Sequence, residues 1–118
     1  MRIPKSQRDK LRERSGGVCE ICFWNQATNW HHRKNRSQLG GNELSNALHL
    51  CGSGTTGCHG MVTENPALAY ENGWSVRSGY DPAAVPVLRH GSDWVVFDNG
   101  GGLRRYDVPN GESRQAPT

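Results

Sequence analysis

Four cysteines in two pairs have the residue type and the spacing of ligands for a structural zinc ion. Cys19 and Cys22 are separated by two residues, so one tight turn can bring both thiolates to a tetrahedral metal centre. Cys51 and Cys58 have six residues between them, and three glycines give that loop the freedom to fold back. Four thiolates would close the coordination shell, so we expect this zinc to be structural. Two disulfide bonds are the alternative for the same residues.

Histidines form a second group of candidate functional residues. His31 and His32 are adjacent and are followed at once by a run of cations, and His59 follows Cys58 directly. An imidazole has an ordinary pKa of about 6.5, so it can accept a proton at neutral pH, and in its neutral form it ligates metals. Successive side chains of a strand point to opposite faces, so adjacent histidines are not expected to share one role within a regular strand.

The order of these residues resembles that of the HNH endonucleases. The match runs in sequence order through residues 14–22, His31-His32-Arg33, residues 45–48 and residues 50–60, which is roughly half of the chain. The residues that follow, through Leu88, are similar to the small HNH proteins of actinobacterial phages. The resemblance implies a ββα-metal core, in which a β-hairpin and a helix surround one catalytic metal.

By that resemblance, His32 is the general base, and His31 and His59 are ligands of the catalytic divalent metal. Asn46 is the asparagine of the motif and is expected to tie the loop with hydrogen bonds that hold His32 in its orientation. Hydrolysis of a phosphodiester needs an activated water and a cation near the phosphate oxygens, so these residue types suit that reaction. The strand is expected to end at the histidine pair, with His32 past its last regular pair, so that both rings serve one site.

The resemblance leaves the identity of the catalytic metal open. Many members of the family carry a further histidine four residues after the position of His59, whereas this chain has Thr63, followed by Glu64. Whether either residue contributes a ligand stays open. Two imidazoles suit Mn²⁺, Ni²⁺ or Zn²⁺, and an oxygen-rich remainder of the shell would admit Mg²⁺.

Positive charge is concentrated in the first third of the chain. Residues 1–40 contain nine Lys and Arg against three Asp and Glu, whereas the remainder contains five against eight, for a net charge of +3. This asymmetry is typical of a protein with a nucleic-acid partner, and a solvated basic helix is the alternative. The cations beside the histidine pair are expected to contact DNA phosphates without reading bases. They are Arg33, Lys34 and Arg36.

Short elements are predicted to position these residues. A capping box at Ser6–Asp9 predicts a helix that ends at Gly16-Gly17. Trp24 and Trp30 are expected to pack in a thin core. The next expected elements are a cysteine knuckle at 18–30 that leads into a strand ending at His31, a returning strand at 47–50, and a helical turn at 59–63. They are followed by a helix at 67–72 after Asn65-Pro66, a hairpin of 85–88 with 94–97, and a third strand at 103–106.

The sequence therefore predicts an α+β fold in one domain, residues 1–106. Its parts are an N-terminal basic helix, a ββα-metal core at about 14–74 stapled by the four-cysteine zinc, and a C-terminal β-hairpin or meander at about 80–106. Hydrophobic residues are only 34% of a chain of 118 residues, so a metal staple is expected to supplement a small core. Residues 107–118 are polar and aperiodic and are expected to be a disordered tail.

The expected function is that of a metal-dependent HNH DNA endonuclease, a hydrolase of phosphodiester bonds, encoded by a phage for DNA packaging or for homing. A non-catalytic zinc-stapled DNA-binding module is the alternative. Double-stranded DNA is the expected partner, with a phage terminase for the packaging role, and the protein is expected to be a monomer. No apolar run of membrane-spanning length and no signal segment are found, which favours the cytoplasm of the host cell.

Overall fold

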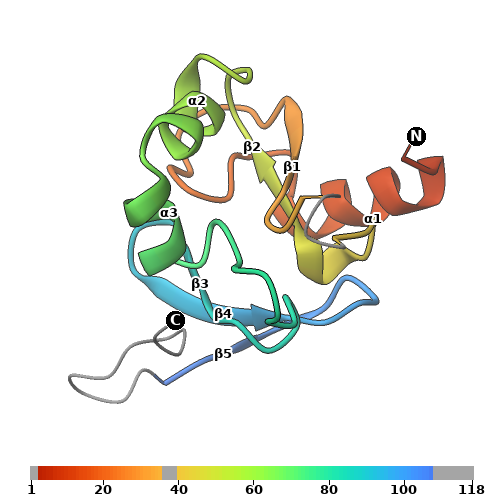
Figure 1. The fold of residues 1–118 in the computed structure, drawn as a ribbon. Helices are drawn as coiled ribbons and strands as arrows, with labels where there is room; N and C mark the ends of the chain where they lie inside the picture. The colour runs from red at the N-terminus through yellow and green to blue at the C-terminus, as the bar shows by residue number, and fades with distance from the viewer. Residues whose placement is uncertain (1–2, 36–39, 108–118) are drawn as a thin grey trace.

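The computed structural model describes residues 3–35 and 40–107 and shows an α+β fold with two separate antiparallel sheets (Figure 1). The predicted tail, apart from Asp107, and the predicted DNA contact Arg36 lie outside the described residues. The elements are α1 (Lys5–Ser15), β1 (Asn29–His32), the short 3-10 helix η2 (Leu44–Asn46), β2 (Ala47–Leu50), α2 (Gly57–Glu64), α3 (Pro66–Glu71), β3 (Val87–Arg89), β4 (Asp93–Phe97) and β5 (Leu103–Arg105).

The first sheet is a two-stranded hairpin followed along the chain by a helix. Strand β1 pairs with β2 in antiparallel register, with Trp30 opposite His49 and His32 opposite Ala47. Alternation along the strands puts these four side chains on one face and His31 on the other. Helix α1 packs near β2, and α2 also packs against β2 (Figure 1).

The second sheet is a three-stranded meander in the order β3-β4-β5, which confirms the predicted hairpin and third strand. Gly73 joins this sheet to the rest of the protein. Its φ is +74°, and a Cβ at this position would lie 1.9 Å from the carbonyl oxygen of Pro86. The chain therefore needs glycine here, because any side chain would force the two segments apart.

Helix α1 has the predicted end but not the predicted start. Gly16 adopts a left-handed conformation with φ 68°, and its N–H donates to the carbonyl of Arg12, which is the expected C-terminal cap. The helix begins at Lys5, after Pro4, which is two residues earlier than a cap at Ser6 predicts, and no side chain caps it. The predicted capping box at Ser6 is therefore wrong, because Ser6 already lies inside the first helical turn.

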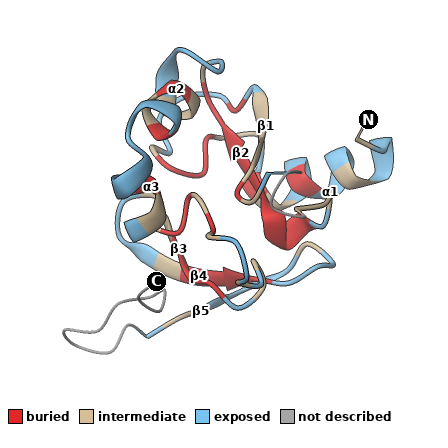
Figure 2. Ribbon diagram, in the orientation of Figure 1, coloured by how far each residue is buried: buried red, intermediate tan, exposed pale blue. Residues whose placement is uncertain are grey.

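Buried apolar side chains form two clusters, one on each face of the β1–β2 hairpin. The larger cluster includes Leu48 and Leu50 and continues to β4 and the cysteines. The smaller one joins Leu11 of α1 to Ala47, with Trp30 packed against it. Strand β2 is buried throughout, whereas α1 and α2 expose much of their surface (Figure 2). Trp30 packs as predicted, but the prediction for Trp24 is wrong, because its side chain is 89% exposed.

A buried ionic network connects α1, the knuckle and β3. The carboxylate of Glu20 accepts hydrogen bonds from the guanidinium of Arg14 at 2.9 and 3.0 Å and from Arg89 Nε at 3.0 Å. Glu20 is fully buried, and it also accepts the backbone N–H of His49. Burial by itself would raise the pKa of Glu20, but the charge of Arg14 outweighs it and lowers that pKa. Glu20 is therefore ionised at neutral pH and holds three segments together.

Along residues 3–35 and 40–107, no helix combines the length and the apolar character that crossing a membrane requires.

Candidate functional site

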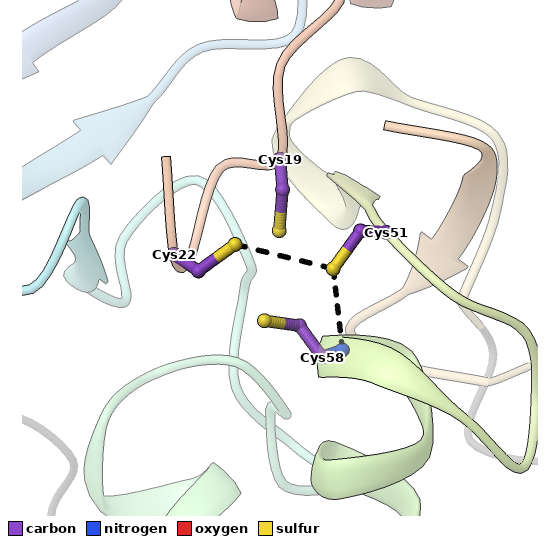
Figure 3. Close-up of side chains that lie close together, drawn as sticks. All are labelled: Cys19, Cys22, Cys51 and Cys58. Atoms are coloured by element: carbon purple, nitrogen blue, oxygen red, sulfur yellow. Dashed lines mark hydrogen bonds between the residues drawn. The ribbon is translucent and has the colours of Figure 1, made fainter. Parts of the chain in front are cut away.

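The four cysteine sulfurs converge on one point, as the spacing of the two pairs predicts (Figure 3). All four Sγ atoms lie within 4.8 Å of one another, and those of Cys22 and Cys51 are 3.9 Å apart. Thiolates at a Zn–S distance of about 2.3 Å around a tetrahedral ion would be on the order of 3.8 Å apart. The cysteines are free thiols, so the alternative of two disulfides does not hold. This cluster could hold a structural metal such as zinc.

Two turns and a helix start bring the sulfurs together. Cys19 and Cys22 lie in the knuckle before β1, Cys51 follows β2, and Cys58 lies in the first turn of α2. The N–H of Cys58 donates to the sulfur of Cys51 at 3.4 Å. The N–H of Trp24 donates to the sulfur of Cys22 at 3.5 Å. Backbone donors aimed at sulfur stabilise thiolates, which are the form that binds metal.

The thiols differ in how readily they lose a proton. Burial would raise the pKa of Cys22, but backbone N–H groups of Trp24 and Asn25 outweigh it and lower that pKa to about 7. Burial raises the pKa of Cys19 and of Cys58, and the neighbouring Cys19 raises that of Cys58 further. Four thiolates therefore do not form here without a cation to offset their charges, which fits a metal-binding cluster.

His31 and His59 lie next to each other on the inner face of the hairpin. Their ring centroids are 5.2 Å apart at an interplanar angle of 65°. The Nε2 of His31 donates to the carbonyl of Trp74 at 2.8 Å, because a carbonyl can only accept, and this leaves the lone pair of His31 on Nδ1. Among the described residues, the buried Nδ1 of His59 has no hydrogen-bond partner. The chain therefore brings these two predicted ligands together.

Two imidazoles on one metal at an M–N distance of about 2.0–2.1 Å would have ring centroids on the order of 5 Å apart, as His31 and His59 do. Burial lowers the pKa of His31 to about 4 and lowers that of His59, so both rings are neutral at pH 7. The unpartnered Nδ1 of His59 and the neutral rings fit a divalent metal.

His32 lies on the opposite face of β1 from His31. It pairs with Ala47 in the register of the hairpin, so the expectation that it lies past the last regular pair is wrong. The physical reason is that the strand continues through residue 32, and alternation turns consecutive rings to opposite faces. His32 Nε2 lies 2.9 Å from Asn42 Oδ1, and its ring centroid is 5.9 Å from that of Trp30.

Asn46 ties the loop after the histidine pair, as expected. Its Oδ1 accepts the N–H of Lys34, and its Nδ2 donates to the carbonyls of Lys34 and Gly41. Its exposed fraction is 0%, so Asn46 cannot touch a substrate and is a positioning residue. It closes the two ends of the loop on each other, whereas the contact that orients the His32 ring comes from Asn42.

The prediction that Arg33 contacts DNA is wrong. Its side chain is buried, with an exposed fraction of 2%, and its guanidinium donates to four backbone carbonyls, those of Gly73, Ser45, Pro82 and Val85, at 2.7–3.0 Å. Burial lowers its pKa to about 9, which still leaves it charged at neutral pH.

Lys34, the next predicted DNA contact, donates from Nζ to the carbonyl of Tyr80 at 2.9 Å and is partly buried. Arg33 and Lys34 therefore tie the hairpin to the segment before β3.

No family model, curated protein or solved structure matches this chain. Functional inference therefore rests on the residues and their geometry.

The two residues considered as further metal ligands do not complete a three-ligand site. Thr63 donates its hydroxyl to the carbonyl of His59 at 3.0 Å, and Glu64 is exposed at the end of α2. Within the described ranges, the four cysteines are the one group of three or more residues with metal-binding geometry. A metal on His31 and His59 would therefore take its other ligands from water or from a phosphate.

Two contacts that matter here were not predicted from the sequence. One is the contact of Asn42 with His32, since Asn42 lies in a polar loop whose sequence does not distinguish it from its neighbours. The other is the contact of His31 with the backbone carbonyl of Trp74, which no side-chain type can reveal. Glu20 did carry a signal, because it is a carboxylate placed between two zinc-spaced cysteines.

We expect His31 to make the protein less stable in mild acid. Burial lowers its folded-state pKa to about 4, whereas the unfolded chain has a histidine pKa of about 6.5. As the pH falls below the unfolded value, the unfolded state takes up the proton first, so stability is lost until the folded pKa is reached. Between about pH 7 and pH 5.5 this group alone should remove about 1 kcal/mol from the free energy of unfolding.

Urea unfolding at these two pH values, without added divalent metal and with the zinc content checked, measures this loss. His31→Gln keeps an amide donor for the carbonyl of Trp74 and does not titrate, so its stability should fall less than that of the wild type. Equal losses in the two proteins would contradict the assignment.

Proposed function

We propose that this protein is a metal-dependent DNA endonuclease of the HNH type, which hydrolyses phosphodiester bonds of double-stranded DNA. The observation that carries the proposal is the neighbouring pair of neutral imidazoles, His31 and His59, at the junction of the β1–β2 hairpin with α2. One of the two rings has a buried nitrogen without a partner among the described residues. A strand pair followed by a helix, with histidines at these positions, is the arrangement that the HNH resemblance implies.

In this proposal, His32 is the general base. With the amide oxygen of Asn42 as the acceptor, His32 donates from Nε2, and its Nδ1 carries the lone pair. Nδ1 would take a proton from the water that attacks phosphorus, and Asn42 keeps the ring in that tautomer. His31 and His32 start on opposite faces of β1, so the phosphodiester would lie across the end of the strand, where the faces meet.

His31 and His59 would hold the catalytic metal. The carbonyl of Trp74 fixes the His31 tautomer that leaves Nδ1 for a metal, which is the usual role of a hydrogen-bonded neighbour of a ligand. A bound divalent cation would supply charge to offset that growing on the phosphate oxygens. Two imidazoles with water or phosphate oxygens suit Mn²⁺, Ni²⁺, Zn²⁺ or Mg²⁺.

A non-catalytic, zinc-stapled DNA-binding module is the second candidate. It is favoured by the opposite orientation of His31 and His32 across β1, and by the lack, among the described residues, of a third metal-ligating side chain grouped with His31 and His59. Such a module would bind DNA without using either ring, so nicking of plasmid DNA separates the two candidates.

The test is a metal titration of plasmid nicking by the wild type and three variants. His32→Ala should keep its fold and its metal yet lose about 10²–10⁴-fold in rate, the usual size of general-base catalysis. His31→Ala and His59→Ala should regain part of their activity at high metal concentration, because they weaken metal affinity instead. His90→Asn is the control, since His90 has φ 57°, a conformation that asparagine also adopts.

Full activity of His32→Ala would refute the mechanism. Recovery of His32→Ala in excess metal, without recovery of His31→Ala, would mean that the two roles are exchanged. Absence of metal-dependent nicking by the wild type would leave the DNA-binding module as the function.

A further inference from the structure

A groove of about 340 Å³ runs between α1 and the hairpin, on the face of β1 that carries His32. Its outer wall is helix α1, and its inner wall is formed by the segment before β1 and by residues of both strands. The lining residues are Lys5, Arg8, Asp9, Leu11, Arg12, Thr28, Trp30 and His49.

The groove carries two cations without partners. Lys5 and Asp9 pair with each other at 2.7 Å, so their charges largely cancel. Arg8 and Arg12 are exposed and lie four residues apart on α1, and their guanidinium groups form no ion pair or hydrogen bond among the residues that the structure describes. Like charges at this spacing repel each other, and an anion bound between them would remove that repulsion.

Trp30 provides a second, independent sign of a ligand in this groove. Its indole Nε1 is buried and has no acceptor among the described residues. Buried N–H groups are almost always hydrogen-bonded, so this donor calls for an acceptor, and a water that bridges it to a phosphate in the groove would supply one. The Trp30 ring lies 5.9 Å from that of His32, which places the groove beside the proposed general base.

We propose that the groove between α1 and β1 binds the phosphate backbone of duplex DNA and delivers the neighbouring phosphodiester to His32. This inference rests on the proposed nuclease function, because His32 has a role only there. Arg8 and Arg12 lie about 6 Å apart along the helix axis, and this is close to the axial rise of two nucleotides of one strand, about 7 Å. Arg8 and Arg12 can therefore contact different phosphates of one strand.

The position of the other predicted DNA contacts supports this assignment. Arg33 is buried, and Lys34 is bonded to the carbonyl of Tyr80, so both make contacts inside the protein, whereas the guanidinium groups of Arg8 and Arg12 do not. His49, at the floor of the groove, bonds to Ser15 Oγ at 2.7 Å, and its pKa is lowered by burial. The net charge of the lining is thus set by Arg8 and Arg12, and such cations contact backbone without reading sequence.

The experiment is a salt titration of duplex DNA binding, measured by fluorescence anisotropy without added divalent metal. The double variant Arg8→Gln/Arg12→Gln should lower the slope of log affinity against log salt by about 1.8, since each lost phosphate contact removes about 0.9. The control is Arg104→Gln/Arg105→Gln, which removes the same charge from the exposed strand β5 and should lower the slope by less than half as much. Trp30→Phe should weaken binding about 5-fold, with an unchanged slope.

Equal losses in the two double variants would overturn the groove, because they would show that net charge alone drives binding. So would failure of the wild type to bind duplex DNA, or tighter binding of duplex RNA through the same arginines. If the protein nicks DNA but Arg8 and Arg12 are dispensable for binding, the proposed DNA-binding groove is contradicted and the proposed nuclease function stands. If DNA binds through Arg8 and Arg12 but is never nicked, the proposed DNA-binding groove stands and the proposed nuclease function is contradicted.

Discussion

Cys58→Ser should abolish binding of the expected structural zinc and unfold the protein, with loss of the proposed nuclease activity. Four thiolates are required to close the shell, and the binding free energy of structural zinc, about 10–16 kcal/mol in small domains, is as large as the whole stability of a typical domain. Cys58 lies in the first turn of α2, next to His59, so its loss also disorders the proposed metal-binding histidine. The measurements are elemental analysis, far-UV circular dichroism and a thermal melt.

The control is Thr55→Ala, an exposed position in the same loop, which should change the stability by no more than about 0.5 kcal/mol. The wild type should contain one zinc per chain, and a chelator should unfold it. A protein purified without zinc, or one in which mass spectrometry finds two disulfides, would contradict this prediction.

Arg33→Met and Arg33→Lys should each destabilise the protein by on the order of 5 kcal/mol. The guanidinium gives hydrogen bonds to four carbonyls inside the protein, and each bond to a charged donor contributes about 1.5–3 kcal/mol. Lysine keeps the charge but has one donor nitrogen and cannot reproduce the planar fork, so it should fail nearly as badly as methionine.

Urea unfolding measures this effect, with Arg104→Lys on the exposed strand β5 as the matched control. A phosphate-binding arginine would behave differently, because lysine would largely replace it and stability would hardly change. Wild-type stability in Arg33→Lys, together with DNA binding that is weakened in Arg33→Met and largely kept in Arg33→Lys, would therefore restore the DNA-contact role of Arg33.

Local features of this chain were predictable because their causes are local. The cysteine spacing and the intervening glycines restrict the chain enough to predict the sulfur cluster. The short apolar runs and turn residues predicted the hairpin, the meander and the end of α1 at Gly16. The start of α1 was missed because a proline at position 4 can precede the first turn as well as a serine cap can, and nothing local favours one over the other.

The roles of the charged residues depended on contacts between distant segments. Arg33 looks like its neighbours in sequence, yet its acceptors lie 12 to 52 residues away along the chain, and only the folded arrangement brings those carbonyls to it. Glu20, Arg14 and Arg89 form their network for the same reason.

For the histidine pair, part of the site was predictable from the sequence and part depended on the tertiary structure. Its residue types, and its position before a loop closed by Asn46, could be recognised in the sequence. That His31 faces His59 while His32 faces Trp30 follows from the register of β1 on β2, in which a shift of one residue would exchange the two faces. Register is set by packing of both faces of the hairpin against α1 and α2, and no local pattern encodes that balance.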